Sequence, residues 1–144
     1  MKTRIAYLSV LLAFVITLPL NANGKDELQK YFSETAKKVK ATENTVEKRK
    51  ILDESFQKMF NALNVVQNSV FVSEDDRLGI DKFKSSLKEK KDELAGTNGF
   101  ERVPDNQLNS FADYVVQDSE QAAETITISI VTLLLILIVV ILLF

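Results

Sequence analysis

Apolar residues are spread unevenly along this chain of 144 residues, and the longest run lies at its carboxyl end. The 19 residues 126–144 carry no charge, and Thr127, Ser129 and Thr132 are their polar members. A helix of this length is about 28 Å long, close to the roughly 30 Å hydrocarbon core of a bilayer. The run therefore predicts a transmembrane helix over 126–144. The alternative, a buried helix of a globular protein, would require a polar face.

A second, shorter apolar run lies at the amino end of the chain. Two basic residues, Lys2 and Arg4, precede an apolar stretch over 5–18, and small residues follow it. This order is typical of a secretory signal peptide, which we predict over 1–22; the alternative is a retained anchor. In both cases the basic start stays in the cytoplasm, so the residues up to about Glu124 lie outside it.

Between the two runs the apolar positions follow helical spacing. From Leu52 they recur with a 4-3-4-3-4 spacing, which keeps one side of a helix apolar. These positions are Leu52, Phe56, Met59, Leu63, Val66 and Val70, with Phe60 widening the stripe. A weaker stripe precedes them, at Leu28, Phe32, Val39 and Val46. Residues 41–45 are poor helix formers, and whether the chain bends there is open.

The next helix has a recognisable start and end. Ser73 precedes three acids, as an N-cap does, and Gly96 can take the left-handed conformation of a C-cap. We therefore predict a helix over 74–95. Its predicted inward side consists of Ile80, Phe83, Leu87 and Leu94.

After Pro104 the apolar positions again share one side of a helix. They are Leu108, Phe111, Ala112, Val115 and Ala122, and neither Gly nor Pro follows before the end of the chain. This predicts one unbroken helix over 105–144. The predicted fold is all-α: a small antiparallel bundle outside the membrane (23–103), an acidic helix beside the membrane (104–125) and a single transmembrane span (126–144).

Composition narrows the environment and the chemistry. The chain has no Cys and no Asn-x-Ser/Thr sequon, which favours a bacterial envelope. In a eukaryote the tail would instead be a GPI-attachment signal, with Ser119 or Ala122 near the attachment point. Because His is also absent, the side chains that most often act as base, nucleophile or metal ligand near neutral pH are missing. We therefore predict no enzyme activity, no cofactor and no metal.

Charge excludes some partners and indicates others. Basic groups such as Lys37-Lys38-Lys40 are interleaved with acids outside the cytoplasm, so they predict solvated helix faces and no nucleic-acid binding. The acidic cluster Glu74-Asp75-Asp76 with Asp81 lacks the spacing of a calcium loop, and we interpret it as helix capping. Beside the membrane, acids outnumber the single Arg102, which predicts a stalk or a surface for a basic partner. The candidate surface residues are Asp105, Asp113, Asp118, Glu120 and Glu124.

Three hydroxyl residues share one face of the predicted unbroken helix. Thr125, Ser129 and Thr132 follow i, i+4 and i+7 spacing, so they are candidates for contact with a second membrane helix. Alternatively, each hydroxyl bonds back to its own helix.

These patterns predict a non-enzymatic envelope protein. We expect its helical domain to face the periplasm, tethered to the cell membrane, as an accessory or scaffold subunit of a membrane complex. Its expected partners are the lipid bilayer and another membrane or periplasmic protein, or a second copy. The alternative is a small membrane-active or pore-forming protein that oligomerises through its hydrophobic tail.

Overall fold

The computed structural model describes residues 24–125 and 128–143, so the predicted signal peptide lies outside the described residues. The described residues form five α-helices, one 3₁₀ turn and no strand, and the all-α prediction is confirmed. The elements are α2 (Gly24–Ala41), α3 (Thr45–Gln67), α4 (Glu74–Ala95), η1 (Asp105–Gln107), α5 (Leu108–Thr125) and α6 (Ile130–Leu143).

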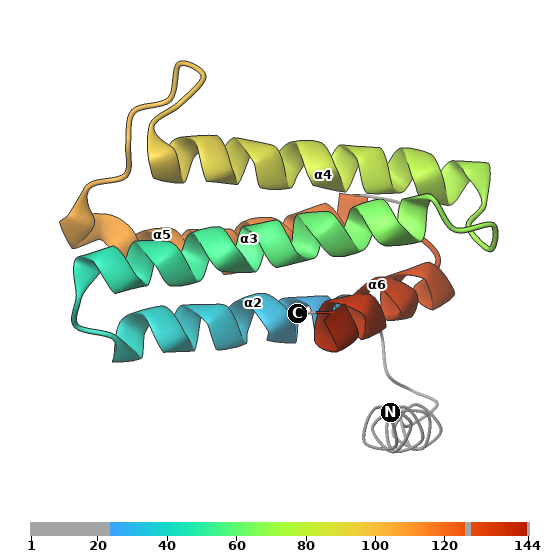
Figure 1. Ribbon diagram of the computed structural model, residues 1–144, viewed down its shortest axis with the longest axis horizontal. Helices are drawn as coiled ribbons and strands as arrows, with labels where there is room; N and C mark the ends of the chain where they lie inside the picture. The colour runs from blue at the N-terminus through green and yellow to red at the C-terminus, as the bar shows by residue number, and fades with distance from the viewer. Residues whose placement is uncertain (1–23, 126–127, 144) are drawn as a thin grey trace, which may run out of the picture.

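Helices α2 to α5 form an antiparallel bundle with α3 at its centre (Figure 1). The most extensive contact joins α2 to α5, and α3 packs against both α2 and α4. Helix α6 turns back and lies against α2 and α3, so it belongs to the same bundle. The core includes Phe32 from α2, Phe56 from α3 and Phe111 from α5.

The helix ends follow from local chemistry. The chain does bend between α2 and α3, where Asn44 accepts a hydrogen bond from the backbone N–H of Glu47 at 3.1 Å and caps α3. At the start of α4, Ser73 Oγ accepts from the backbone N–H of Asp76 at 3.2 Å. At its end, Gly96 has a φ of +73°. Both predicted caps of α4 are confirmed, and so is its predicted inward side.

Two positions of the predicted apolar stripes are wrong. Val46 is 76% exposed, because it lies beside the bend on the outer side of α3. Val70 is 86% exposed, because α3 ends at Gln67 and Val70 lies in the following turn.

The predicted unbroken helix over 105–144 is also wrong. Helix α5 ends at Thr125 and α6 begins at Ile130, with Ile128 and Ser129 outside both helices. Residues 125–129 alternate β-branched and hydroxyl side chains, which lower helix propensity without Gly or Pro. The reversal lets α6 bury Leu133, Ile136, Leu137 and Val140 against the bundle, which a projecting stalk would not.

A membrane span was predicted over 126–144. Among the described helices none is both long enough and apolar enough to cross a bilayer, and α6 itself contains 14 residues.

Candidate functional site

The feature that sets this bundle apart is α6, whose described residues carry no charge and whose surface divides into two faces. The inward face consists of Leu133, Ile136, Leu137 and Val140, each at most 8% exposed. On the outer face, Val131 is 70% exposed and Leu142 is 45% exposed, and Ile141, at the edge between the two faces, is 68% exposed. Large aliphatic side chains therefore lie on both sides of this helix. An amphipathic helix of a water-soluble domain would instead carry polar residues on the outer side.

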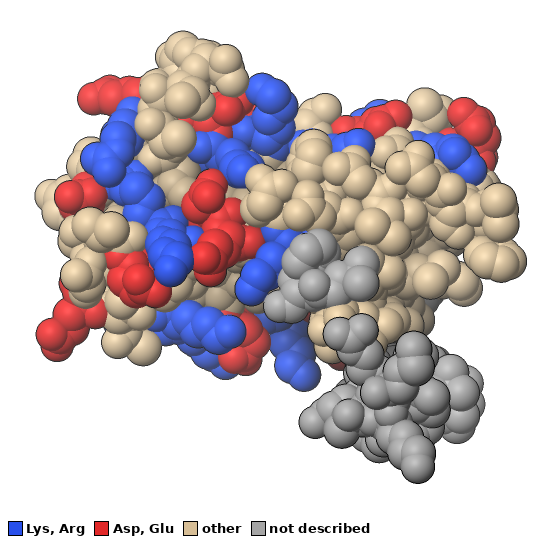
Figure 2. Space-filling view, in the orientation of Figure 1, with Lys and Arg blue, Asp and Glu red and all other residues tan. Residues whose placement is uncertain are grey.

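Uncharged side chains cover much of the half of the molecule that contains α6 (Figure 2). Figure 2 shows basic and acidic side chains intermixed over one half of the molecule, whereas uncharged side chains gather over the half that contains α6. This uncharged half includes the exposed aliphatic side chains of α6, Val131, Ile141 and Leu142.

The amino end of α6 is held by a buried carboxylate. Asp76, in the first turn of α4, is 7% exposed. Its Oδ1 accepts from the backbone N–H of Ser129 at 2.8 Å, and its Oδ2 lies 2.7 Å from the Ser129 hydroxyl. The Thr132 hydroxyl donates to the same Oδ2 at 2.7 Å. We call Asp76, Ser129 and Thr132 the α6 latch.

The latch also caps α6. Ser129 Oγ accepts from the backbone N–H of Thr132 at 3.3 Å, and the Ser129 carbonyl accepts from Leu133 at 3.0 Å. A carboxylate beside the first turn is favoured by the positive end of the helix dipole. One acid in α4 therefore orders the start of α6.

Burial raises the pKa of Asp76, but hydrogen bonds from Thr132, from the Ser129 backbone and hydroxyl, and from Ser73 outweigh it and hold the pKa below its usual value. The ionised carboxylate is thus the form that fits this place.

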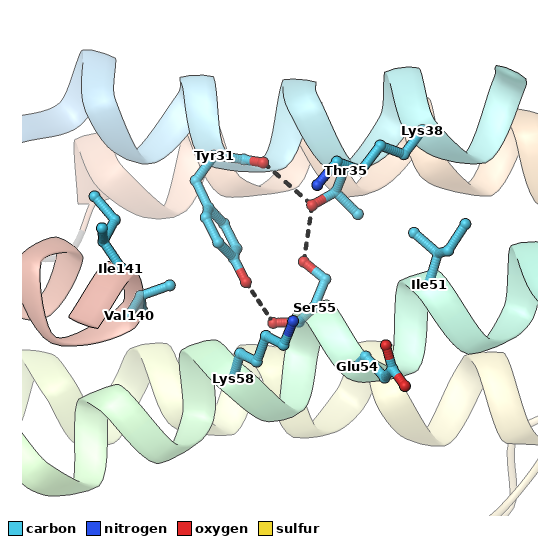
Figure 3. A pocket seen from close by; sticks show the side chains of 9 residues that line it. All are labelled: Tyr31, Thr35, Lys38, Ile51, Glu54, Ser55, Lys58, Val140 and Ile141. Atoms are coloured by element: carbon cyan, nitrogen blue, oxygen red, sulfur yellow. Dashed lines mark hydrogen bonds between the residues drawn. The ribbon is translucent and has the colours of Figure 1, made fainter. Parts of the chain in front are cut away.

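The carboxyl end of α6 lies against the bundle beside open grooves, without, among the described residues, a hydrogen-bonded carboxylate like that at its amino end. On the α3 side a groove of about 290 Å³ lies beside the carboxyl end; its lining is Tyr31, Thr35, Lys38, Ile51, Glu54, Ser55, Lys58, Val140 and Ile141. Figure 3 shows these side chains converging from α2, α3 and α6. A second groove of similar volume follows the α2 side, and Ile141 lines both. The end of α6 therefore lies between two open grooves.

The floor of the first groove is polar and satisfied within the bundle. The Tyr31 hydroxyl donates to the Ser55 carbonyl at 2.9 Å, and the hydroxyls of Thr35 and Ser55 lie 2.9 Å apart (Figure 3). Burial raises the pKa of Tyr31, and its bond to Ser55 opposes this rise less strongly.

The predicted hydroxyl face is divided by the helix break. Ser129 and Thr132 bond to Asp76 in the latch, whereas Thr125 ends α5 and its side chain lies outside the described ones. The three do not share one helix, and their contact with a second membrane helix stays a prediction.

The candidate acidic surface is placed mostly against cations of its own chain. Asp113 pairs with Lys40, and Glu120 accepts from Gln29. Asp105 pairs with Arg49 at 2.8 Å, and this hydrogen bond lowers the pKa of Asp105. The Glu124 side chain lies outside the described ones. Binding of a basic partner to this surface stays a prediction.

Asp118 belongs to a partly exposed network around the buried Lys90, which the sequence analysis missed. Lys90 Nζ donates to Tyr114 Oη at 2.8 Å and to Glu93 at 3.1 Å, and it lies 3.7 Å from Asp118. Burial lowers the pKa of Lys90, but these partners outweigh it and raise the pKa above its usual value. Lys90 is a fixed cation that joins α4 to α5.

The described residues contain no group of three or more His, Cys, Asp or Glu that could hold a metal ion. The absence of enzyme activity stays a prediction. No family model matches the chain, and neither a curated protein nor a solved structure matches it.

Proposed function

We propose that the chain is a non-enzymatic protein of the cell envelope that acts at a lipid bilayer. In this proposal residues 126–144 enter the membrane, and the bundle of α2 to α5 is the domain that meets partners on the periplasmic side. The observation that carries it is the exposure of Val131, Ile141 and Leu142 on α6, a helix without a charge. Aliphatic side chains on every side of a helix suit hydrocarbon better than water.

Two features of the bundle support this proposal. Helices α2 to α5 have a core of their own, because Leu28, Leu52, Ile80 and Leu108, one from each helix, are at most 2% exposed. Their surface is charged and mixed, as the surface of a water-exposed domain is. A folded outer domain would therefore remain when the tail is in lipid.

The test is membrane partition of the full chain with neutral phosphatidylcholine vesicles. Ile141→Asp places a carboxylate at the edge of the contact between α6 and the bundle, where the side chain is 68% exposed and lines the open grooves, so the buried core should be unchanged. A carboxylate costs about 2.5–3.5 kcal/mol at the centre of a span and less toward its end, where Ile141 lies, so the partition coefficient should fall at least several-fold.

Val46→Asp is the matched control, because Val46 is 76% exposed on α3 and receives the same charge. It should bind as the unchanged chain does. Equal binding by the two variants would show that α6 is not the membrane contact and would overturn the proposal.

The same outer face supports a second candidate, a membrane-active protein that oligomerises through its tail. Exposed aliphatic side chains on α6 would also fit a second α6. A discrete homo-oligomer in mild detergent, lost in Ile141→Asp, would favour this candidate. A monomer that recovers a different protein after crosslinking in intact membranes would favour the first.

A further inference from the structure

Helix α6 is attached to the bundle in two different ways along its length. At the amino end, Asp76 accepts from the Ser129 N–H and lies within hydrogen-bond distance of the Ser129 and Thr132 hydroxyls. At the carboxyl end, Ile141 lines both grooves, Val140 lines the first and Leu137 the second, and charged residues are among the lining of each groove. The helix is thus held by hydrogen bonds to a carboxylate where it begins, and by apolar contacts beside two open grooves where it ends.

We infer that α6 is a detachable helix, held on the bundle by the α6 latch and able to leave from its carboxyl end into a lipid bilayer. This inference rests on the proposed function, since the bilayer is the occupant that would receive α6. It adds that Asp76 sets the equilibrium between α6 docked on the bundle and α6 inserted in the bilayer.

The seat that α6 would leave does not need α6 to satisfy its polar groups. Tyr31, Thr35 and Ser55 already bond to one another across α2 and α3. Departure of α6 therefore leaves no unpaired hydroxyl in this seat, which removes a cost that usually opposes the opening of a core.

The start of α6 keeps part of its cap after release. Ser129 Oγ accepts from the Thr132 backbone N–H and lies 3.0 Å from the Thr132 hydroxyl, and both of these interactions are internal to the segment. Release breaks the hydrogen bonds that Ser129 and Thr132 donate to Asp76. A charged acceptor forms stronger hydrogen bonds than a neutral one, so Asp76 is the main polar restraint on α6.

Lipid is the favoured occupant on chemical grounds. The residues 128–143 contain no titratable side chain, and α6 exposes Val131 and Ile141 even when docked. Hydrocarbon accepts all of these side chains, whereas water accepts the inward face poorly. A bilayer therefore competes with the bundle for the same helix.

The first experiment measures the latch without lipid. The chain has no cysteine, so Val140→Cys supplies a single thiol at a site that is 4% exposed when α6 is docked. Its rate of reaction with a maleimide reports the undocked fraction. Adding Asp76→Asn should raise this rate at least about tenfold, because the amide is a weaker acceptor than the carboxylate.

Asp75→Asn is the matched control, because Asp75 is exposed in the same first turn of α4 and loses the same charge. It should leave the rate unchanged. Helical content by circular dichroism excludes general unfolding, and Thr132→Val, which removes one donor to Asp76, should raise the rate by a smaller factor. Equal rates in the Asp75 and Asp76 variants would overturn the latch.

The second experiment adds phosphatidylcholine vesicles. Asp76→Asn should increase the bound fraction several-fold over Asp75→Asn, and Asp76 lies outside α6, so the hydropathy of the inserting segment is the same in both. Vesicle binding by the unchanged chain with no Asp76 effect would overturn the latch and leave the proposed function standing. A faster thiol reaction without vesicle binding by any variant would overturn lipid as the occupant and the proposed function with it.

Discussion

Lys90 and Asp76 are buried charges on the same face of α4, and they differ in what surrounds them. Lys90 is enclosed by the phenol of Tyr114 and the carboxylates of Glu93 and Asp118. Its ammonium also lies 4.4 Å from the centroid of the Tyr114 ring. Asp76 has hydroxyls and a backbone amide as partners and, among the residues that the structure describes, no cation. Lys90 therefore joins α4 to α5 through charge. Asp76 is bonded to Ser129 and Thr132, and it loses these donors if α6 leaves the bundle.

The contribution of Lys90 is measurable against a neighbour. Lys90→Ala leaves Glu93 and Asp118 close together without their cation, so we expect a loss of about 2–4 kcal/mol in the free energy of unfolding. Lys88→Ala is the control, because the Lys88 side chain is 63% exposed in its pair with Asp92 and should change stability by less than about 1 kcal/mol. Denaturant unfolding measures both, and equal losses would contradict the buried role of Lys90.

Alanine substitutions at Gly96 and Gly99 distinguish the cost of a strained backbone from the cost of a steric clash. Both have positive φ, but a Cβ on Gly96 would lie 2.5 Å from Arg102 Cβ, whereas one on Gly99 would meet nothing within 4 Å. Gly99→Ala should cost about 1 kcal/mol from the left-handed backbone alone. Gly96→Ala should cost about 2–4 kcal/mol, because the loop must also move away from α4. Equal thermal shifts in the two variants would show that the loop adapts freely.

At the scale of single elements, capping and spacing made α4 predictable. Ser73 and Gly96 marked its ends, and the 4-3-4-3 spacing marked Ile80, Phe83 and Leu87 as inward. The same spacing continues through Asp76 and Lys90, which are one step before Ile80 and one step after Leu87. That signal was available for both buried charges. In the sequence analysis Asp76 is interpreted as helix capping and the basic groups as solvated helix faces, and neither interpretation uses the position of the residue on the stripe.

The break before α6 depends on longer-range contacts. Residues 125–129 have low helix propensity but no breaker, so local sequence does not decide between a bend and a continuous helix. The outcome depends on Asp76, 53 residues before Ser129, and on the seat formed by α2 and α3. Contacts between residues so far apart in sequence are not encoded in any local pattern.

The buried sides of α2 and α3 can be tested with one valine in each helix. Val39 in α2 is fully buried and Val46 in α3 is 76% exposed, although both belong to the same predicted stripe. Val39→Ala should lower the free energy of unfolding by about 2 kcal/mol, from reduced burial and the cavity left behind. Val46→Ala, the same chemical change, should stay within about 0.5 kcal/mol. Similar losses at the two sites would mean that the bend at 42–44 is wrongly placed.

At the scale of the whole molecule, the hydrophobic tail is joined to the bundle by buried apolar side chains and by the hydrogen bonds of one carboxylate, Asp76. The pKa of Asp76 is lowered in the folded chain, so its ionised form stabilises the docked state. This contribution is fully present above the ordinary aspartate pKa of about 3.9 and is lost as the pH falls through the lowered value. Around Asp76, Glu74 and Asp75 are exposed, Arg77 bonds to the carbonyls of Ser69 and Val72, and α6 offers no titratable group. Mild acid therefore does not release the tail.

The pH dependence of stability tests this coupling in the full chain. The difference in unfolding free energy between the unchanged chain and Asp76→Asn should be constant from about pH 5 to neutrality, because Asp76 stays ionised there. Below about pH 4 the difference should shrink, since a protonated Asp76 offers α6 little more than an amide does. The corresponding difference for Asp75→Asn should be small at every pH, because Asp75 does not bond to α6. If the difference in unfolding free energy for Asp76→Asn already shrinks near about pH 6, the pKa of the Asp76 carboxyl is raised. The tail would then be released by mild acid, and competition by lipid would not be the only route by which α6 leaves the bundle.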